Sequence, residues 1–287
     1  MSCSKHVDYH VHPDYSIDAA PESIEQYCLR GLELELSELC FTPHFEVDPV
    51  RQKVDWFVRV AGEIKKMDEL HWLEHFFSVI ETAQKKFHPA IKIKAGIEIG
   101  YEPGCEKSIE QVLNGFPFDF VLGSIHCLNH IAISSKKESP CYFTGKTAQQ
   151  IALEYFSMLE QAVNTCLFDC IAHVDLYRRY GWLYFGESIH DIHKEYLECI
   201  EDIFKFMAKK KIALEINTSG LRRGLDDMNP SQDILSIAVR SGISLFTTGS
   251  DAHSVKELGQ GLNQAEELLT KFSCQKATYT GRNPDQF

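Results

Sequence analysis

Short apolar runs alternate with longer, regularly patterned segments along the chain, and this alternation predicts its secondary structure. Seven runs have the length and composition of buried strands, and they span 7–9, 39–41, 91–97, 120–124, 170–172, 213–216 and 244–247. The segments between them carry apolar residues every three or four positions, as amphipathic helices do. Strands that alternate with helices in this way build a mostly parallel sheet, either closed as a barrel or open with helices on both faces.

Three of the intervening segments give the clearest helix signals. One helical face is formed by Ile151, Tyr155, Leu159 and Ala162, and another by Leu197, Ile200, Phe204 and Met207. In the third segment, Asn229 and Pro230 predict a helix over 231–239, with Asn229 as its cap and Pro230 at its first position. No internal repeat, low-complexity stretch or Gly/Ser-rich linker interrupts the pattern, so we expect one domain over 1–287.

Polar residues that can bind metal ions or protons follow each of the seven runs. In chain order they are Asp8, His10 and His12; His44; Glu98; His126; His173 and Asp175; Glu215, Asn217 and Ser219; Asp251 and His253. In α/β barrels and doubly wound sheets the carboxyl ends of the strands share one face, where active sites form. We therefore expect residues scattered over the whole sequence to converge in one cleft.

Two short pairs within this set favour a metal site. Because side chains alternate along a strand, His10 and His12 point to the same side and can chelate one ion. Asp251 and His253 repeat this arrangement near the end of the chain. Imidazole and carboxylate ligands together suit zinc, iron(II) or manganese rather than calcium. We interpret Asp8 as a partner that orients one of the metal-binding histidines.

The remaining histidines are interpreted as surface or packing residues. They are His6, His71, His75, His88, His130, His190 and His193. Trp56, Phe57, Trp72, Phe76 and Phe77 predict an aromatic helical pair that serves as a lid or as a helix-packing surface. By their position, these aromatic residues or the loop 127–146 would cover the cleft.

Composition and charge narrow the partners and the compartment. The chain has 287 residues, of which 44% are hydrophobic and 24% charged, and this is the balance of a globular protein. Its net charge of −12 argues against polymeric nucleic acid as a partner, because sequence-independent binding depends on Lys and Arg. No stretch reaches the roughly 20 apolar residues of a membrane span, and the first residues lack the apolar core of a signal peptide. Ten scattered cysteines without a Cys-x-x-Cys pair favour reduced, mostly buried thiols in a cytoplasmic protein.

Six motifs stand at the ends of the predicted strands. They are Asp-Tyr-His-Val-His at 8–12, Phe-Thr-Pro-His at 41–44, Gly-Ile-Glu at 96–98, Gly-Ser-Ile-His at 123–126, His-Val-Asp at 173–175 and Gly-Ser-Asp-Ala-His at 249–253. In this order they resemble the motifs of the PHP (polymerase and histidinol phosphatase) superfamily. The stretch 215–222 is similar to the histidinol-phosphatase branch in particular. The resemblance runs from about residue 6 to residue 255. It implies a distorted (β/α)7 barrel, TIM-barrel-like, with a metal site at the C-terminal ends of the strands.

The resemblance also implies three divalent metal ions, which would be zinc, manganese or iron. Their ligand sets would be His10, His12, Glu98 and Asp251 for the first; Asp18, His44 and His253 for the second; and Glu98, His126 and His173 for the third. Glu98 would thus bridge two ions. Within these sets, Glu98, Asp251 and His253 are assigned to catalysis. All nine positions carry a residue that can bind a metal, which favours an active enzyme over a degenerate relative.

The activity that this resemblance implies is hydrolysis of L-histidinol phosphate to L-histidinol and phosphate, by attack of a metal-bridging hydroxide. Three divalent ions, three carboxylates and the hydroxide sum to about +2, which attracts a phosphate dianion despite the net charge of −12. Arginine adds bidentate contacts to phosphate. We expect Arg179 and Arg222 to make them, and we interpret Arg178 and Arg223 as solvent-facing residues.

Three alternatives stay open at this point. The substrate could be another small phosphomonoester or a nucleotide, or the domain could be a metal-stabilised binding module without activity. For Arg222, the alternative is a structural role in which it caps a strand end or pairs with Asp226 or Asp227. The sequence does not specify an oligomeric state.

Overall fold

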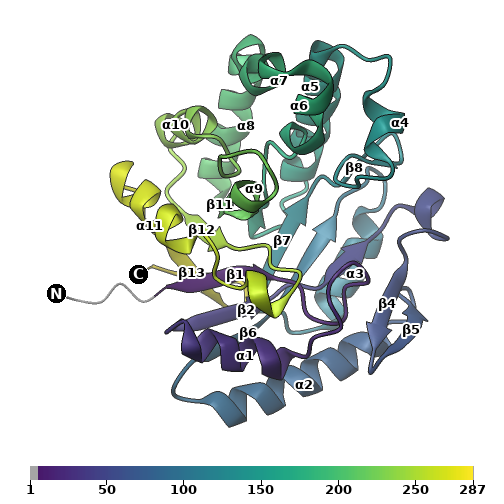
Figure 1. The fold of residues 1–287 in the computed structure, drawn as a ribbon, viewed down its shortest axis with the longest axis vertical. Coiled ribbons are helices and arrows are strands. Elements are labelled where there is room, and N and C mark those ends of the chain that lie inside the picture. Colours follow the sequence, from purple (N-terminus) through teal and green to yellow (C-terminus); the bar gives the residue numbers. More distant parts are fainter. Residues whose placement is uncertain (1–5, 287) are drawn as a thin grey trace.

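Seven parallel strands form a nearly closed barrel in the computed structural model of the protein, which describes residues 6–286 (Figure 1). In spatial order they are β1 (Val7–Val11), β2 (Glu38–Phe41), β6 (Lys92–Gly100), β7 (Phe120–Ser124), β10 (Cys170–Ile171), β11 (Ala213–Asn217) and β12 (Phe246–Gly249). The amide of His12 donates to the carbonyl of Ala252 at 2.9 Å, so β1 and β12 lie side by side where the barrel closes. The predicted distorted (β/α)7 barrel is therefore confirmed, and a short strand, β3 (His44–Glu46), pairs with β6 in addition.

All seven predicted strands are present because each apolar run is buried between the barrel interior and the surrounding helices. Inside the barrel, Tyr9 packs edge-to-face against Phe120, with ring centroids 5.1 Å apart. The register between β1 and β2 shifts between Asp8 and Val11, the kind of irregularity that re-aims side chains next to a site. The strands therefore point their C-terminal ends, with the polar motifs, to one face of the barrel.

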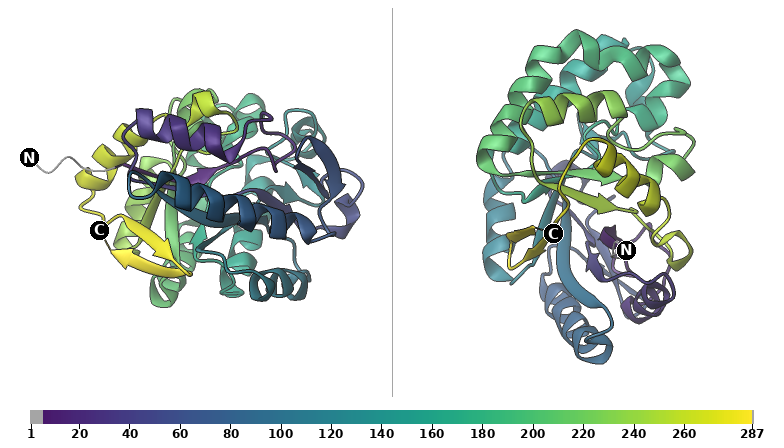
Figure 2. Two further views of the ribbon diagram at one scale, coloured as in Figure 1. Left: turned by 90° about the horizontal axis from the view of Figure 1, so that it is seen from below. Right: turned by 90° about the vertical axis from the view of Figure 1, so that its left-hand side faces the viewer.

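Helices surround the barrel, as Figures 1 and 2 show. The longer ones are α1 (Ile24–Glu33), α2 (His71–Phe87), α3 (Glu106–Gly115), α5 (Ala148–Asn164), α8 (Leu197–Lys210), α10 (Gln232–Arg240) and α11 (Leu262–Lys271). The shorter ones are α4 (Ser139–Phe143), α6 (Arg178–Phe185), α7 (Glu187–Asp191) and α9 (Ser219–Arg222), with the 3₁₀ turns η1 (Pro49–Arg51), η2 (Ile192–Tyr196) and η3 (Val255–Glu257). Within residues 6–286 no helix is both long and apolar enough to cross a membrane.

Three antiparallel hairpins complete the fold. They are β4 (Phe57–Val60) with β5 (Glu63–Lys66), β8 (Cys127–Leu128) with β9 (Ile131–Ala132), and β13 (Ala277–Thr280) with β14 (Asn283–Gln286). The last hairpin, yellow in Figure 2, closes the N-terminal end of the barrel. There the amide of Tyr279 donates to the hydroxyl of Tyr9 at 2.7 Å, and Arg282 binds Asp169 just before β10. The other end of the barrel stays open for the site.

The structure confirms one predicted helical face in full and corrects parts of the others. Ile151, Tyr155, Leu159 and Ala162 are all buried on α5. On α8, Ile200, Phe204 and Met207 are buried, but Leu197 stands at the exposed start of the helix. Leu197 is the first residue of α8, directly after the 3₁₀ turn η2, and its side chain points away from the buried face of the helix.

The predicted cap of the helix over 231–239 is wrong. Ser231 caps α10, and its hydroxyl accepts from the amide of Ile234. Asn229 pairs through its backbone with Asn217 instead, and its side-chain amide donates to Asp175. These contacts tie Asn229 to the end of β11, so the helix starts two residues later than the Asn-Pro signal indicates.

The aromatic segment before β6 is also not a pair of helices. Trp72, Phe76 and Phe77 lie on α2, whereas Phe57 begins β4 and Trp56 immediately precedes it. Burial alternates along β4, with Val58 and Val60 buried, and this period of two is that of a strand. A hairpin therefore replaces the first predicted helix.

The cysteines that the structure describes are reduced, as the sequence predicts, but fewer of them are buried than it predicts. Within residues 6–286 no disulfide is formed. The buried thiols are Cys28, Cys40, Cys127 and Cys170; Cys105, Cys199 and Cys274 are half-buried, and Cys141 and Cys166 are exposed. The expectation that most thiols are buried is therefore wrong for the described part of the chain, and Cys3 lies outside it.

Candidate metal centre

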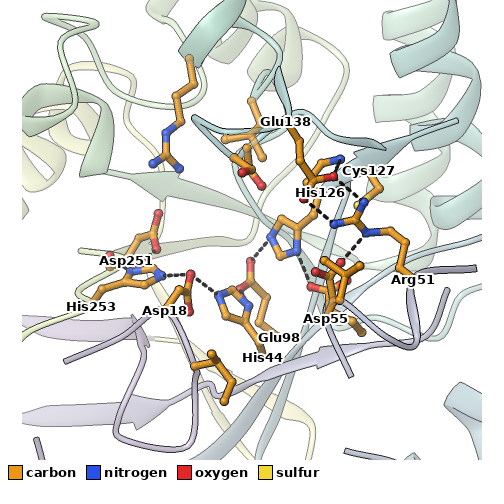
Figure 3. A pocket seen from close by; sticks show the side chains of 18 of the residues that line it. Asp18, His44, Arg51, Asp55, Glu98, His126, Cys127, Glu138, Asp251 and His253 are labelled. Carbon is orange, nitrogen blue, oxygen red and sulfur yellow. Dashed lines mark hydrogen bonds and ion pairs between the residues drawn. The ribbon is translucent and has the colours of Figure 1, made fainter. Parts of the chain in front are cut away.

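The C-terminal ends of the barrel strands surround a cavity of about 480 Å³ (Figure 3). Seven of the nine predicted metal ligands line it: Asp18, His44, Glu98, His126, His173, Asp251 and His253. The other two, His10 and His12, have no exposed surface and contact Glu98 from the barrel interior. Residues that are up to 243 positions apart in the sequence therefore share one site.

Three side chains at its base, His10, His12 and Glu98, are spaced as ligands of one ion, and Asp251 lies beside them, with Oδ1 3.9 Å from His10 Nε2. The Nε2 atoms of His10 and His12 lie 3.3 and 3.5 Å from Glu98 Oε2, and His12 Nε2 lies 3.4 Å from Asp251 Oδ1. Tetrahedral zinc, with bonds of about 2.0–2.2 Å, separates its ligand atoms by roughly 3.3–3.6 Å.

The hydrogen bonding of these atoms shows independently whether they suit a divalent ion. His10 Nε2 and His12 Nε2 are buried and have no hydrogen-bond partner among residues 6–286, and Glu98 Oε2 has only ion-pair contacts, the shortest of which is 2.8 Å to His44 Nδ1. Buried polar atoms are rarely left unpaired, because doing so costs about 1–3 kcal/mol each. The donor set and its unpaired atoms therefore fit a divalent ion.

Asp18, His44 and His253 form a second set at the cavity edge. Asp18 Oδ2 lies 3.2 Å from His253 Nε2 and 3.6 Å from His44 Nε2. Figure 3 shows the Asp18 carboxylate between the two rings. The ligand atoms of His44 and His253 also lie close to those of His12, and three protein ligands leave open coordination places for water or substrate.

Glu98 joins the first set to the third. Its Oε1 atom lies 3.2 Å from His126 Nε2 and 3.1 Å from His173 Nε2, whereas its Oε2 atom faces His10 and His12. One carboxylate thus presents an oxygen to each of two histidine pairs. This is the arrangement that a bridging ligand requires, and the structure brings together the three sets that the sequence motifs imply.

The pKa shifts of the site favour an ionised Glu98 and a neutral His12. Burial would lower the pKa of His10, His44 and His126, but neighbouring carboxylates outweigh it and raise these three pKa values. Burial alone would raise the pKa of Glu98, but the imidazoles of His10, His126 and His44 outweigh it and hold this pKa well below its usual range. Burial, aided by the neighbouring His44 and His253 rings, lowers the pKa of His12 well below its ordinary value. A carboxylate that stays charged and an imidazole that stays neutral are the forms that bind metals.

Two carboxylates outside the predicted sets orient the histidine rings. Glu215 Oε1 lies 2.6 Å from His10 Nδ1, and Glu46 Oε1 lies 2.7 Å from His126 Nδ1. A carboxylate at Nδ1 fixes the tautomer so that Nε2 presents its lone pair to the metal. Sequence reasoning did not single out Glu46, although its position two residues after His44 on β3 was the available signal.

The role predicted for Asp8 is wrong. Its carboxylate accepts from the backbone amides of Ser250 at 2.8 Å, Gly259 at 3.1 Å and His10 at 3.4 Å, and within residues 6–286 it has no hydrogen bond to a histidine ring. Asp8 thereby holds the segment that follows β12 against β1. Glu215, on β11, has the ring-orienting role instead.

The arginines are arranged differently from the prediction. Arg179, at the start of α6, lines the cavity as expected, but Arg223 lines it in place of Arg222. Arg223 Nη2 lies 3.2 Å from His253 Nδ1, and burial together with Arg223 lowers the pKa of Arg179. Two neighbouring guanidinium groups in a cavity wall favour an anionic ligand.

Arg222 and Arg178 serve the scaffold in this arrangement. Arg222 Nη2 donates to the backbone carbonyl of Asp251 at 2.6 Å. Arg178 is buried and binds Asp175 at 2.7 Å and Asp227 at 2.8 Å. The expectation that Arg178 and Arg223 face solvent is therefore wrong for both.

The segments expected to cover the cleft do contribute to its wall. Phe57 of β4 lines the cavity, and so do Cys127, Ala132 and Glu138 from the loop 127–146. Two histidines outside the three sets are held by other contacts. His193 Nδ1 donates to the carbonyl of His190 at 2.9 Å, and His190 Nδ1 accepts from Arg178 Nε at 3.1 Å.

A parallel seven-stranded barrel with this cluster at its C-terminal face defines a metal-binding α/β barrel of the PHP type. Residues 8–219 match the PHP domain family, and the chain belongs to that family.

Among curated proteins, the chain is similar to histidinol-phosphatase from Lactococcus lactis subsp. lactis. The two are 29% identical over 287 residues, which covers 98% of this chain and 97% of that one. It is also similar to a probable histidinol-phosphatase from Deinococcus radiodurans, with 28% identity over 257 residues and 90% of each chain covered.

Solved structures show the same similarity. The crystal structure of histidinol phosphate phosphatase from Lactococcus lactis, in complex with zinc, L-histidinol and phosphate, superposes with a TM-score of 0.77 and 26% identity. The match covers 98% of this chain and 99% of that one. A second structure, of a histidinol phosphatase homologue from Listeria monocytogenes, shares the fold with a TM-score of 0.76 at 23% identity over 90% of this chain and 99% of that one.

Proposed function

We propose that this protein is a metal-dependent phosphatase that hydrolyses L-histidinol phosphate to L-histidinol and phosphate. The observation that carries the proposal is the convergence of nine His, Asp and Glu side chains in three sets, with Glu98 facing two of them. The Lactococcus lactis relative, which binds zinc, L-histidinol and phosphate, supports this substrate. The proposal includes three divalent ions, of zinc, manganese or iron, held by the three sets.

Divalent ions bound there would lower the pKa of coordinated water and neutralise the charge of the phosphoryl oxygens. The residues of the chain would hold these ions and orient their ligands. Glu215 and Glu46 hold the rings of His10 and His126 in the tautomer that binds metal. Glu98 fixes the distance between the first and third ligand sets, because its two oxygens belong to one rigid carboxylate.

Arg179 and Arg223 are proposed to bind the phosphate. Both line the cavity beside Asp251 and His253, and guanidinium groups bind phosphate oxygens in a bidentate manner. This assignment keeps Arg179 from the sequence prediction and replaces Arg222 with Arg223. We further propose that the chain acts as one domain, in the cytoplasm, on a small molecule.

Metal removal and a substrate panel test the proposal together. The purified protein is freed of metal with a chelator, reloaded with Zn²⁺, Mn²⁺ or Fe²⁺, and assayed for phosphate release. The panel contains L-histidinol phosphate, other phosphorylated metabolites, nucleoside monophosphates and p-nitrophenyl phosphate. We expect no turnover without metal, recovery on reloading, and the highest kcat/KM for L-histidinol phosphate.

Each part of the proposal can fail separately in this experiment. Full turnover by rigorously metal-free protein would contradict the metal dependence. A higher kcat/KM for another phosphomonoester would replace the substrate but keep the phosphatase. Metal-loaded protein that releases no phosphate from any ester would identify a metal-stabilised binding module.

A further inference from the structure

The charged side chains of the cavity are segregated. Arg223 contacts His253 and Asp251 on one side. Figure 3 shows that Asp55 and Glu138 lie across from these two, around Arg51 and beyond His126. All five of the charged residues Arg51, Asp55, Glu138, Arg223 and Asp251 line the same cavity. The cavity therefore has one wall with the guanidinium groups of Arg179 and Arg223 near the metal sets, and a second wall that contains the carboxylates of Asp55 and Glu138.

Arg51 is not available to bind a phosphate. It is buried, and its Nε donates to Asp55. Its Nη1 donates to Glu138 at 2.7 Å and to the carbonyl of His130 at 2.8 Å, and its Nη2 donates to Glu138 at 3.0 Å. Two carboxylates thus surround one guanidinium, and this wall has a net charge of about −1 when both are ionised. Arg51 and Glu138 act as positioning residues for Asp55.

Asp55 has one carboxylate oxygen to offer a ligand. Oδ2 accepts from Arg51, whereas Oδ1 has no hydrogen-bond partner within residues 6–286. The side chain is only 24% exposed, so water solvates it incompletely. Burial raises the pKa of Asp55, and the nearby Glu46 and Glu138 act in the same direction against Arg51. A cation that donates a hydrogen bond to Oδ1 would stabilise the ionised form of Asp55, which has Arg51 as its cationic partner and two glutamates nearby.

The residues beside Asp55 in the chain add apolar surface to the same cavity. Val54 and Phe57 also line the cavity, and Val54 is 61% exposed although it is a large hydrophobic residue. A flat ring placed over them would remove apolar surface from water. The wall therefore presents a carboxylate and an apolar face within three residues of each other.

L-Histidinol phosphate has the matching distribution of charge, with a phosphate at one end, an ammonium group next to it and an imidazole ring. We propose that Asp55 determines specificity by accepting a hydrogen bond from the amine of the leaving alcohol, while Val54 and Phe57 face its imidazole ring. This inference rests on the proposed function, because it assumes that the phosphate lies at Arg179 and Arg223.

A substrate–variant cycle tests the role of Asp55. The substrates are L-histidinol phosphate and its deamino analogue, 3-(imidazol-4-yl)propyl phosphate, and the proteins are the wild type, Asp55→Asn and Asp68→Asn. Asparagine keeps the size of Asp55 and an oxygen that can accept from Arg51. Asp68 is exposed and lies outside the cavity, so Asp68→Asn is the matched control. Metal content and thermal unfolding are measured for all three proteins.

We expect the wild type to prefer the amine-bearing ester by about ten- to a hundredfold in kcat/KM, which is the effect of one charged hydrogen bond. In Asp55→Asn this preference should shrink to within about threefold, mainly through a higher KM for L-histidinol phosphate. Asp68→Asn should keep the preference of the wild type. A purely structural role of Asp55 would lower kcat/KM for both esters and leave their ratio unchanged.

An Asp55→Asn protein that keeps the wild-type preference would overturn the assignment while the proposed function stands. If the variant does not fold, equal kcat/KM of the wild type for the two esters would overturn it as well. A wild type that hydrolyses p-nitrophenyl phosphate but not L-histidinol phosphate would refute the proposed substrate, and the assignment of Asp55 would fall with it. The Asp55→Asn variant thus tests the role of Asp55, whereas the wild type alone tests the proposed substrate.

Discussion

The carboxylate of Glu215 lies 2.6 Å from Nδ1 of His10, on the side of the ring opposite to Glu98. Glu215 also accepts from the backbone amide of His173 at 3.0 Å through its other oxygen. One buried carboxylate therefore orients a side chain of the first ligand set and the backbone that carries a residue of the third. The cluster depends on this residue, although Glu215 is not one of the predicted ligands.

Replacing Glu215 with Gln should weaken metal binding. A neutral amide keeps a hydrogen bond but loses the charge that makes His10 a better ligand, and such changes cost roughly 10–100-fold in metal affinity or activity. Metal per chain after dialysis against a metal buffer, together with kcat/KM, measures the effect. Glu198→Gln, on the exposed surface of α8, is the control. Unchanged metal content and activity in Glu215→Gln would contradict the role that we assign to it.

Glu98→Gln should cost more activity than His44→Ala. Glu98 faces His10 and His12 with one oxygen and His126 and His173 with the other, so its charge serves two sets. We expect the Glu98→Gln variant to lose two metal ions. Its kcat/KM should fall by more than the roughly 100-fold that is lost when a carboxylate that only orients a metal ligand is replaced. Elemental analysis and steady-state kinetics compare the variants. Equal losses at equal residual metal content would argue against a bridging carboxylate.

Arg223→Ala and Arg222→Ala should have different consequences. Removing Arg223 from the cavity wall should lower kcat/KM about ten- to over a hundredfold at unchanged metal content, which corresponds to roughly 1.5–3 kcal/mol. Arg223→Lys should recover only part of this loss, because an ammonium group keeps the charge but lacks the planar fork.

Removing Arg222 breaks its hydrogen bond to the carbonyl of Asp251 and should lower the free energy of unfolding by about 1–3 kcal/mol. Kinetics below the melting temperature and thermal unfolding separate the two roles. A normal kcat/KM in Arg223→Ala, with a strong loss in Arg222→Ala, would restore the original assignment of Arg222 to the phosphate.

Arg178→Ala should be the most destabilising of these changes. Arg178 is buried between Asp175 and Asp227, and its removal leaves the charge of Asp175 without its main partner in the interior. Losing one partner of a buried pair costs about 3–5 kcal/mol of unfolding free energy. Denaturant unfolding measures it, with Lys194→Ala, which breaks an exposed pair with Asp191, as the control of little effect. Equal stability of both variants would show that the Arg178 pairs contribute nothing.

The barrel and the residues that gather at its open end could be predicted from the sequence. Each strand is a short apolar run, its bounds differ from the prediction by at most three residues, and a polar motif follows it directly. Parallel strands end on one face, so Glu98 and His173 were expected to meet although 75 positions separate them. The family motifs added the grouping into three sets, which local periodicity alone does not contain.

Only the tertiary structure decided which neighbouring side chain faces the cavity. Arg222 and Arg223 are adjacent at the end of α9, and consecutive residues of a helix point about 100° apart, so one faces Asp251 and its neighbour faces the cavity. The strand pattern does not contain this rotation, because it depends on how the short helix packs against the barrel.

The same holds for contacts between segments that are distant in the sequence. Glu46 meets His126 across 80 positions, and Arg51 binds Glu138 across 87. Neither glutamate belongs to a strand-end motif, and the sequence alone indicates no buried partner for a charged residue outside these motifs. The strand ends determine where the ligands converge, because pairing and side-chain alternation are local rules. The orientation of the histidine rings by Glu215 and Glu46, and the pairing of Arg51 with Asp55 and Glu138, depend on how distant segments pack in three dimensions.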